Sequence, residues 1–231
     1  MAQDFFDLLQ ENSMSLHLQR DLEKLKKEIL KLGTMVESAI NNAILALNNR
    51  EMLYVDEVLR LEDHINEMEV KIEEDCLKIL ALHQPVAGDL RFIVVSLKVN
   101  NDLERMGDFA KNIAKRAREL MQEEPISTLP EFVNELPNLV RTMVRNSLDA
   151  LVKLDVSLAR EVIAMDDKVD EINRAMYQEV TRVAKENASK TAVAISLLST
   201  SRYMERIGDL STNIAEDVIF MVEGRVIRHD D

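Results

Sequence analysis

The stretch Asp-Leu-Glu-Arg-Met-Gly-Asp-Phe-Ala-Lys-Asn-Ile-Ala, residues 102–114, returns near the C-terminus as Tyr-Met-Glu-Arg-Ile-Gly-Asp-Leu-Ser-Thr-Asn-Ile-Ala, residues 203–215. Glu, Arg, Gly, Asp, Asn, Ile and Ala recur in register. Weaker matches join two further pairs of segments, 34–36 with 142–144 and 61–66 with 165–170. Because these segments recur in the same order, the sequence predicts a chain made of two copies of one unit.

The composition favours long helices in both copies. Glycine (5), proline (4) and aromatic residues (4%) are scarce, and glycine and proline are the residues that interrupt helices. We expect an all-α chain of two tandem, internally duplicated three-helix bundles, although 231 residues could by length alone form one domain or two. The predicted helices cover 18–49, 51–82, 89–121, 138–153, 155–185 and 190–222. The first repeat is placed at 14–122, a proline-rich linker at 123–137 and the second repeat at 138–226.

The formal net charge of −13 limits the partners of the chain. A negative surface repels nucleic acid and anionic lipid, so cations and basic protein surfaces are the expected partners. No N-terminal stretch resembles a signal peptide and no run approaches the roughly 20 apolar residues needed to span a bilayer, so a cytoplasmic protein is expected. The single cysteine, Cys76, is interpreted as a core residue.

Carboxylates follow the core stripe of four helices by one position. In the third helix of each repeat, apolar residues alternate spacings of three and four, which is typical of a buried coiled-coil-like stripe. One residue is about 100° around a helix, so the next positions line the rim of the core. These rim residues are Glu62, Asn66, Glu69, Glu73, Glu104, Asp108, Asn112, Asp166, Asp170, Asn173, Glu205, Asp209 and Asn213.

Two interpretations of these carboxylates remain open. If the second and third helices of each repeat pack antiparallel, two acidic stripes face one groove, which would suit a hard cation such as Mg²⁺, Mn²⁺ or iron. Alternatively they are solvated acids balanced by nearby arginines, among them Arg105 and Arg206. Gly107 and Gly208 lie inside the same helices and indicate close packing or the approach of an ion.

At these motifs the chain resembles the PhoU family. The motifs are Gln-Pro-Val-Ala-Gly-Asp-Leu-Arg at 84–91, the segment 102–108 with Asn-Ile-Ala at 112–114, and Met-Glu-Arg-Ile-Gly-Asp at 204–209 with Asn-Ile-Ala-Glu at 213–216. The resemblance runs from about residue 15 to the C-terminus, including Gly-Arg-Val-Ile-Arg-His at 224–229. It gives no role to the first dozen residues.

The resemblance implies a negative regulator of phosphate uptake and phosphate-starvation signalling. Such a protein is cytoplasmic and usually a homodimer. It links the phosphate ABC transporter, through its ATPase subunit, to the sensor histidine kinase of the phosphate regulon, and it reaches the membrane only through protein partners. The family also binds metal through Glu/Asp-x-x-x-Asp motifs, with Mg, Mn or Fe as candidates here.

Transferred position by position, the metal motifs fall on residue pairs in both repeats. Three pairs match the family pattern, and they are Glu104 with Asp108, Asp166 with Asp170, and Glu205 with Asp209. The fourth pair departs from it, because Glu62 is followed four residues later by Asn66. An amide oxygen can ligate a metal but brings no charge, so the first repeat is expected to bind metal more weakly.

Three other functions compete with this one. A catalytic di-metal bundle would need Glu-x-x-His pairs, and none of His17, His64, His83 and His229 has a glutamate three residues before it. No glycine-rich nucleotide-binding loop is present either, so an enzyme is not expected. An accessory protein of a different phosphate permease and a metal-independent helical adaptor both remain compatible with the sequence.

Overall fold

The computed structural model describes the backbone of residues 2–124 and 132–225, and the side chains of residues 16–124 and 135–225. Helices account for nearly all of the described residues, and no strand occurs among them, which confirms the all-α prediction. The elements are α1 (Ala2–Asn49), α2 (Met52–His83), α3 (Ala87–Leu120), α4 (Phe132–Lys153), α5 (Val156–Glu186), the 3₁₀ helix η1 (Ala188–Lys190) and α6 (Thr191–Glu223).

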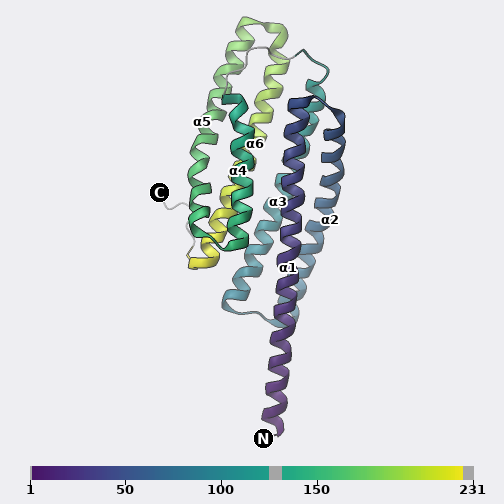
Figure 1. Ribbon diagram of the computed structural model, residues 1–231, viewed down its shortest axis with the longest axis vertical. Helices are drawn as coiled ribbons and strands as arrows, with labels where there is room; N and C mark the ends of the chain where they lie inside the picture. The colour runs from purple at the N-terminus through teal and green to yellow at the C-terminus, as the bar shows by residue number, and fades with distance from the viewer. Residues whose placement is uncertain (1, 125–131, 226–231) are drawn as a thin grey trace.

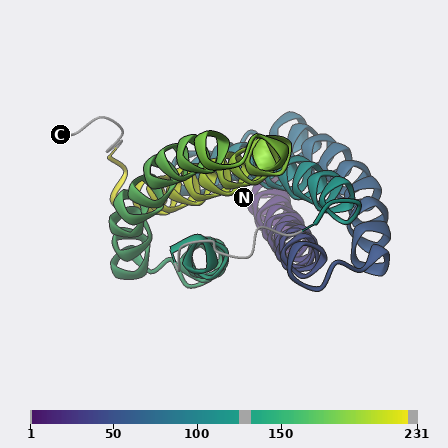
Figure 2. The ribbon, with the colours of Figure 1, turned by 90° about the horizontal axis from the view of Figure 1, so that it is seen from above.

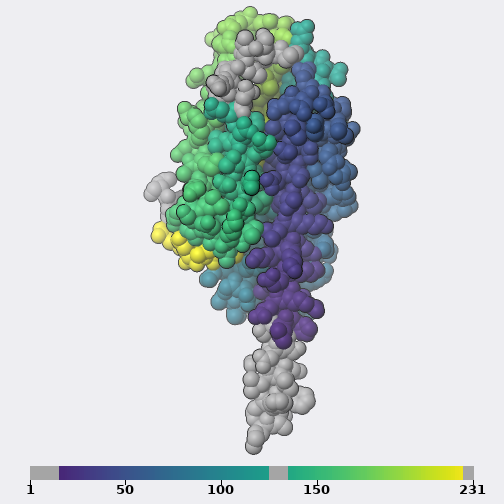
Figure 3. Space-filling view, in the orientation of Figure 1, coloured from purple at the N-terminus to yellow at the C-terminus, as the bar shows by residue number. Residues whose placement is uncertain are grey.

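The helices form two antiparallel three-helix bundles, α1 to α3 and α4 to α6 (Figure 1). The bundles meet where α3 packs against α6, and α1 also contacts α4. Seen from above, α2, α3, α6 and α5 form a curved row, with α1 and α4 on one side of it (Figure 2). On that side α1 and α4 lie next to each other in the space-filling view (Figure 3). The opposite side of the row is therefore left uncovered by α1 and α4.

The predicted core stripes are buried. In α3, Leu103, Met106 and Ala110 are fully buried, and in α6 the matching positions Met204 and Ile207 are buried as well. The stripes of α1, α2, α4 and α5 join them in one continuous hydrophobic core that runs through both repeats. Cys76 belongs to this core, as predicted, and its burial raises the pKa of its thiol to about 12.

Two of the predicted joints have the backbone conformation that ends a helix. Gln84 follows α2 with φ of 45°, and Pro85 then prevents the helix from continuing. Gly224 follows α6 in the left-handed region with φ of 69°, and its N–H donates to the carbonyl of Phe220 at 2.9 Å. The cap predicted at Gly224 is therefore confirmed.

Two helix starts differ from the sequence prediction. Helix α1 begins at Ala2 rather than near residue 18, because no glycine or proline precedes Gly33 to interrupt it. Helix α4 begins at Phe132, so residues 132–137 of the predicted linker are already helical. Pro137 is tolerated there because it removes one hydrogen bond close to the start of the helix. Residues 125–131 of that linker and the tail 226–231, with His229, lie outside the described residues.

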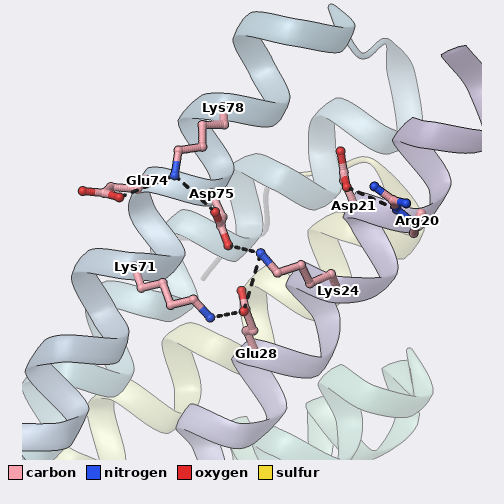
Figure 4. A network of polar contacts seen from close by, with 8 residues as sticks. All are labelled: Arg20, Asp21, Lys24, Glu28, Lys71, Glu74, Asp75 and Lys78. Carbon is pink, nitrogen blue, oxygen red and sulfur yellow. Dashed lines mark hydrogen bonds and ion pairs between the residues drawn. The ribbon is translucent and has the colours of Figure 1, made fainter.

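A network of ion pairs joins α1 to α2 (Figure 4). Lys24 Nζ lies 2.7 Å from Asp75 Oδ2, and Lys71 pairs with Glu28 across the same contact. Lys78 approaches Asp75 at 3.6 Å from within α2. Burial opposes ionisation of Asp75, but the hydrogen bond and charge of Lys24 lower its pKa overall. The network therefore holds α1 and α2 in register by charge as well as by apolar packing.

None of the described helices combines the length and apolar character that crossing a bilayer requires.

Candidate metal centre

Four carboxylates come together where α5 packs against α6. Asp166 and Asp170 are one helical turn apart on α5, and Glu205 and Asp209 are one turn apart on α6. Desolvation and the charges of Asp209 and Asp170 raise the pKa of Asp166 to about 6. Oδ1 of Asp166 is buried and has no hydrogen-bond partner in the structure. The α5–α6 pairing thus gathers negative charge around one unsatisfied oxygen.

The two acids on α6 are perturbed in the same direction. Desolvation and the neighbouring carboxylates of Asp209 and Asp170 raise the pKa of Glu205. Desolvation and Asp170 likewise raise the pKa of Asp209. Arg206 opposes both shifts but does not outweigh them. The arginines therefore offset the raised pKa of these two acids only in part.

The equivalent place in the first repeat, between α2 and α3, is neutralised from within the chain. Glu62 is buried, with 3% of its surface exposed, and it accepts hydrogen bonds from Lys111 Nζ at 2.7 Å and Asn66 Nδ2 at 2.9 Å. Desolvation alone would raise the pKa of Glu62, but Lys111 and Asn66 lower it overall. Glu62 is therefore held as a carboxylate paired with a lysine.

The other acids of the first repeat are more loosely arranged. Glu104 is half-buried, and desolvation together with the charges of Asp108 and Glu69 raises its pKa. Asp108 is exposed. Asn100 Nδ2 donates to the main-chain oxygen of Glu69 at 2.9 Å. In the described part of the first repeat, therefore, Glu62 is paired with a lysine while Glu104 and Asp108 are not.

Lys111 is the residue that the motif analysis overlooked. In the aligned repeats its position is occupied by Thr212, whose hydroxyl donates to the main-chain oxygen of Asp209 at 2.6 Å. The difference is visible in the two quoted stretches, where Lys and Thr stand at the same place. Sequence alone could not show that the lysine reaches across to Glu62 on the neighbouring helix.

The residues present fit a hard cation at α5–α6 better than at α2–α3. Among the described residues, no three carboxylate, histidine or cysteine side chains are already placed as a closed set of metal ligands. The orphaned oxygen of Asp166 and the mutual repulsion with Asp170, Glu205 and Asp209 are what a cation would relieve.

Comparison with known proteins agrees with this duplicated architecture. The family model described as PhoU domain matches the chain twice, at residues 29–117 and 133–218. The chain belongs to the PhoU family. The phosphate-specific transport system accessory protein PhoU homolog of Aquifex aeolicus is 37% identical over 210 residues, covering 91% of this chain and 95% of that protein. Its counterpart in Clostridium acetobutylicum is 34% identical over 212 residues, covering 91% of this chain and 96% of that protein.

Solved PhoU structures share the fold of this chain. The crystal structure of PhoU from Pseudomonas aeruginosa has a TM-score of 0.87 and 35% identity, covering 90% of this chain and 99% of that one. The phosphate transport system regulatory protein PhoU from Streptococcus pneumoniae has a TM-score of 0.81 and 26% identity, covering 90% and 98%. The PhoU resemblance read from the motifs is therefore confirmed.

Proposed function

We propose that this PhoU protein is a cytoplasmic, metal-binding adaptor that restrains phosphate uptake and phosphate-starvation signalling. Its relatives are named as accessory proteins of the phosphate-specific transport system, and a solved relative is named as a regulatory protein of phosphate transport. Those names support an accessory and regulatory role in phosphate transport rather than an enzymatic one. The partners we propose are the ATPase subunit of the phosphate ABC transporter and the sensor histidine kinase.

The observation that carries the metal part of the proposal is the uncompensated α5–α6 site. Buried Oδ1 of Asp166 has no hydrogen-bond partner among the described residues, and the charges of Asp170, Glu205 and Asp209 act on this side chain. A bound Mg²⁺, Mn²⁺ or iron ion would supply the missing positive charge, held by oxygens of Asp166, Asp170, Glu205 and Asp209. In the first repeat, Lys111 already supplies a positive charge to Glu62, so metal binding there would rest on Glu104 and Asp108.

Protein partners and a second copy of the chain are proposed to use exposed apolar side chains. At and near the α2–α3 turn, Leu82, Val86 and Leu90 expose between 41% and 74% of their surface. Exposed apolar patches on soluble proteins commonly mark interaction sites. Regulation through such contacts requires that the partners bind this protein differently in high and low phosphate, because only differential binding transmits a signal.

The proposal is tested by capturing both partners on the purified, untagged protein in high and low phosphate, alongside its metal content. The double variant Glu205→Ala with Asp209→Ala is expected to lose metal and to alter capture. The matched control is Glu104→Ala with Asp108→Ala, the same motif in the first repeat, which should change metal content less. Far-UV circular dichroism checks that both variants fold.

Two results would count against the proposal in different ways. If the metal-free variant captures both partners as the unmodified protein does, the chain is an adaptor that works without metal. If the unmodified protein captures neither partner, its regulatory role belongs to a different phosphate permease.

A further inference from the structure

Three arginines gather in a polar groove lined by residues of α3 and α6, with no residue of α1 or α4 among its lining. The groove has a volume of about 400 Å³ and is lined by Arg105, Arg202 and Arg206 together with Phe109 and Asn213. Glu205 and Asp209, which lie on α6 beside Arg202 and Arg206, also line it. We call this feature the α3–α6 groove.

The three guanidinium groups are poorly paired for a chain with a net charge of −13. Arg105 makes a long ion pair of 3.8 Å with Asp102. Within the described part of the chain, neither Arg202 nor Arg206 lies within 4.0 Å of a carboxylate oxygen. Elsewhere arginines such as Arg60 and Arg182 are closely bound to glutamates of their own helix. The groove therefore holds arginine N–H donors that form no close ion pair with the described residues.

Aromatic packing holds one of these arginines in place without using its N–H donors. The guanidinium of Arg206 lies over the ring of Phe109, 5.8 Å from its centroid. Phe109 in turn stacks on Tyr203, with ring centroids 6.1 Å apart. This contact is with the ring and uses none of the N–H groups of Arg206 in a hydrogen bond, so they can still donate to an acceptor.

The duplication explains why the arginines meet. Arg105 and Arg206 occupy the same position of the repeated Glu-Arg-x-Gly-Asp motif, and α3 and α6 pack antiparallel, which brings the two copies of the motif to one place. Arg202 lies one turn before Arg206 on α6. Like charges four residues apart destabilise a helix modestly, so an anion between them would relieve a repulsion that the fold contains.

From this geometry we propose that the α3–α6 groove binds a phosphate group through Arg105, Arg202 and Arg206. Guanidinium groups match the spacing of phosphate oxygens and bind them bidentately, and the side-chain amide of Asn213 adds a further donor. The phosphate can come from inorganic phosphate or from a nucleotide, since both present the same oxygens. The groove is larger than a phosphate ion, which leaves room for either source.

Binding of the anion depends on the charge of the two acids that share the groove with the arginines, Glu205 and Asp209. Glu205 and Asp209 repel phosphate while they are ionised, so neutralising them strengthens anion binding. This coupling rests on the proposed function, because the neutralising species there is a bound metal ion. By linkage, a metal that tightens phosphate binding is itself bound more tightly when phosphate is present.

The test is calorimetric titration of the full chain with inorganic phosphate and, separately, with ATP, each with and without saturating Mn²⁺. The double variant Arg202→Gln with Arg206→Gln changes two exposed side chains and is expected to weaken binding at least tenfold while retaining Mn²⁺ binding. The matched control, Arg60→Gln with Arg182→Gln, removes the same charge elsewhere and should bind like the unmodified protein. Loss of the ATP signal alone in the arginine variant would assign the site to nucleotide phosphate, and loss of the inorganic phosphate signal would assign it to the free ion.

A second variant separates this inference from the proposed metal binding. Glu205→Gln with Asp209→Asn removes the repelling charges without metal, so it should bind phosphate more tightly than the unmodified protein does in chelator. Equal phosphate affinity in the arginine double variant and the unmodified protein would overturn the inference. So would the absence of phosphate and ATP binding from the charge-neutralised variant, whether or not Mn²⁺ binds to the unmodified protein.

Discussion

Glu62 and Asp166 occupy equivalent positions in the two repeats but have opposite electrostatic surroundings. Lys111 and Asn66 lower the pKa of Glu62, whereas desolvation and neighbouring acids raise the pKa of Asp166 to about 6. Breaking a buried ion pair leaves an uncompensated charge, which usually destabilises more than the pair had stabilised. In the first repeat, Lys111 compensates the buried negative charge of Glu62. In the second repeat, no described lysine compensates Asp166, so a bound cation or a proton would have to do so.

The raised pKa of Asp166 predicts how the stability of metal-free protein depends on pH. Its folded pKa of about 6 lies above the ordinary value of 3.8, so between these values the folded state binds more protons than the unfolded state. The contribution of Asp166 to the free energy of unfolding is therefore favourable at low pH and is lost as pH rises through 6, by about 1 to 3 kcal/mol. Urea denaturation in chelator at pH 5 and pH 7 measures the last part of this loss, about 1 kcal/mol.

The variant Asp166→Asn should be less sensitive to pH over this interval, and more stable than the unmodified protein at pH 7. Asp56→Asn, which removes an exposed carboxylate of α2, is the matched control and should leave the pH dependence unchanged. Saturating Mn²⁺ should also flatten the dependence, since a bound cation replaces the proton. An unaltered slope in Asp166→Asn would show that other groups determine it.

For single residues, the sequence predicted which acids line the grooves but not which of them are paired with a basic side chain. Helical spacing placed Glu62, Glu104, Asp166 and Glu205 on the rims of the grooves, because one residue is a fixed rotation around a helix. Which acid is paired depends on how far a lysine reaches across to the neighbouring helix, as Lys111 does to Glu62. Such a contact depends on helix-to-helix distance, which a pattern along one helix does not contain.

Helices α3 and α6 each have a glycine at the same position of the repeated motif, Gly107 and Gly208, but the two glycines are packed differently. A Cβ added at Gly107 would lie 3.1 Å from Cδ1 of Ile65, closer than an ordinary contact. At Gly208 the nearest atoms are Cγ1 of Val169 at 3.5 Å and Oδ1 of Asp166 at 3.6 Å. Tight helix packing therefore accounts for Gly107, while Gly208 has space for a methyl group.

We predict opposite effects for alanine at these two glycines. Alanine in a helix interior is favoured over glycine by about 1 kcal/mol, so Gly208→Ala should raise the free energy of unfolding by up to that amount. In Gly107→Ala the displaced Ile65 should cancel the gain or reverse it, because overpacking a core costs about 1 to 3 kcal/mol. Urea denaturation of both variants at one pH makes the comparison, and equal stabilisation by both would show that Ile65 yields freely.

Helix boundaries were the least predictable property of the elements. The ends of α2 and α6 followed from local chemistry, since Pro85 and Gly224 terminate helices in most contexts. The start of α4 did not, because three prolines between 125 and 137 indicated a break, yet Pro137 lies inside the helix. A proline near a helix start removes little hydrogen bonding, so its presence does not fix where the helix begins.

Over the whole molecule, the two repeats share one core, although the sequence divides them. The continuous cluster of buried side chains includes residues of all six α-helices. On the α1–α4 contact, Gly33 leaves so little space that an added Cβ would approach Cδ2 of Leu148 to 2.9 Å. Because the two sequence repeats share one hydrophobic core, each repeat need not be a separate folding unit.

We therefore predict that both repeats unfold together in a single cooperative transition. Scanning calorimetry should give one peak whose calorimetric and van't Hoff enthalpies agree. Gly33→Val should move this peak to lower temperature as a whole, because it separates α1 from α4. Two peaks, or a shift confined to part of the transition, would show that the bundles fold independently.

The difference between Lys111 and Thr212, at equivalent positions of the two repeats, also makes the two halves of the molecule electrostatically distinct. Because α3 and α6 pack antiparallel, a half-turn of the molecule exchanges the two bundles, apart from the greater length of α1 (Figure 1). The charges do not share this property, since one groove carries an internal lysine and the other does not. A partner that approached a perfectly duplicated molecule could dock in two orientations with equal energy. In this protein the two binding orientations differ in energy. A partner can therefore bind in one defined orientation although the two bundles are similar in shape.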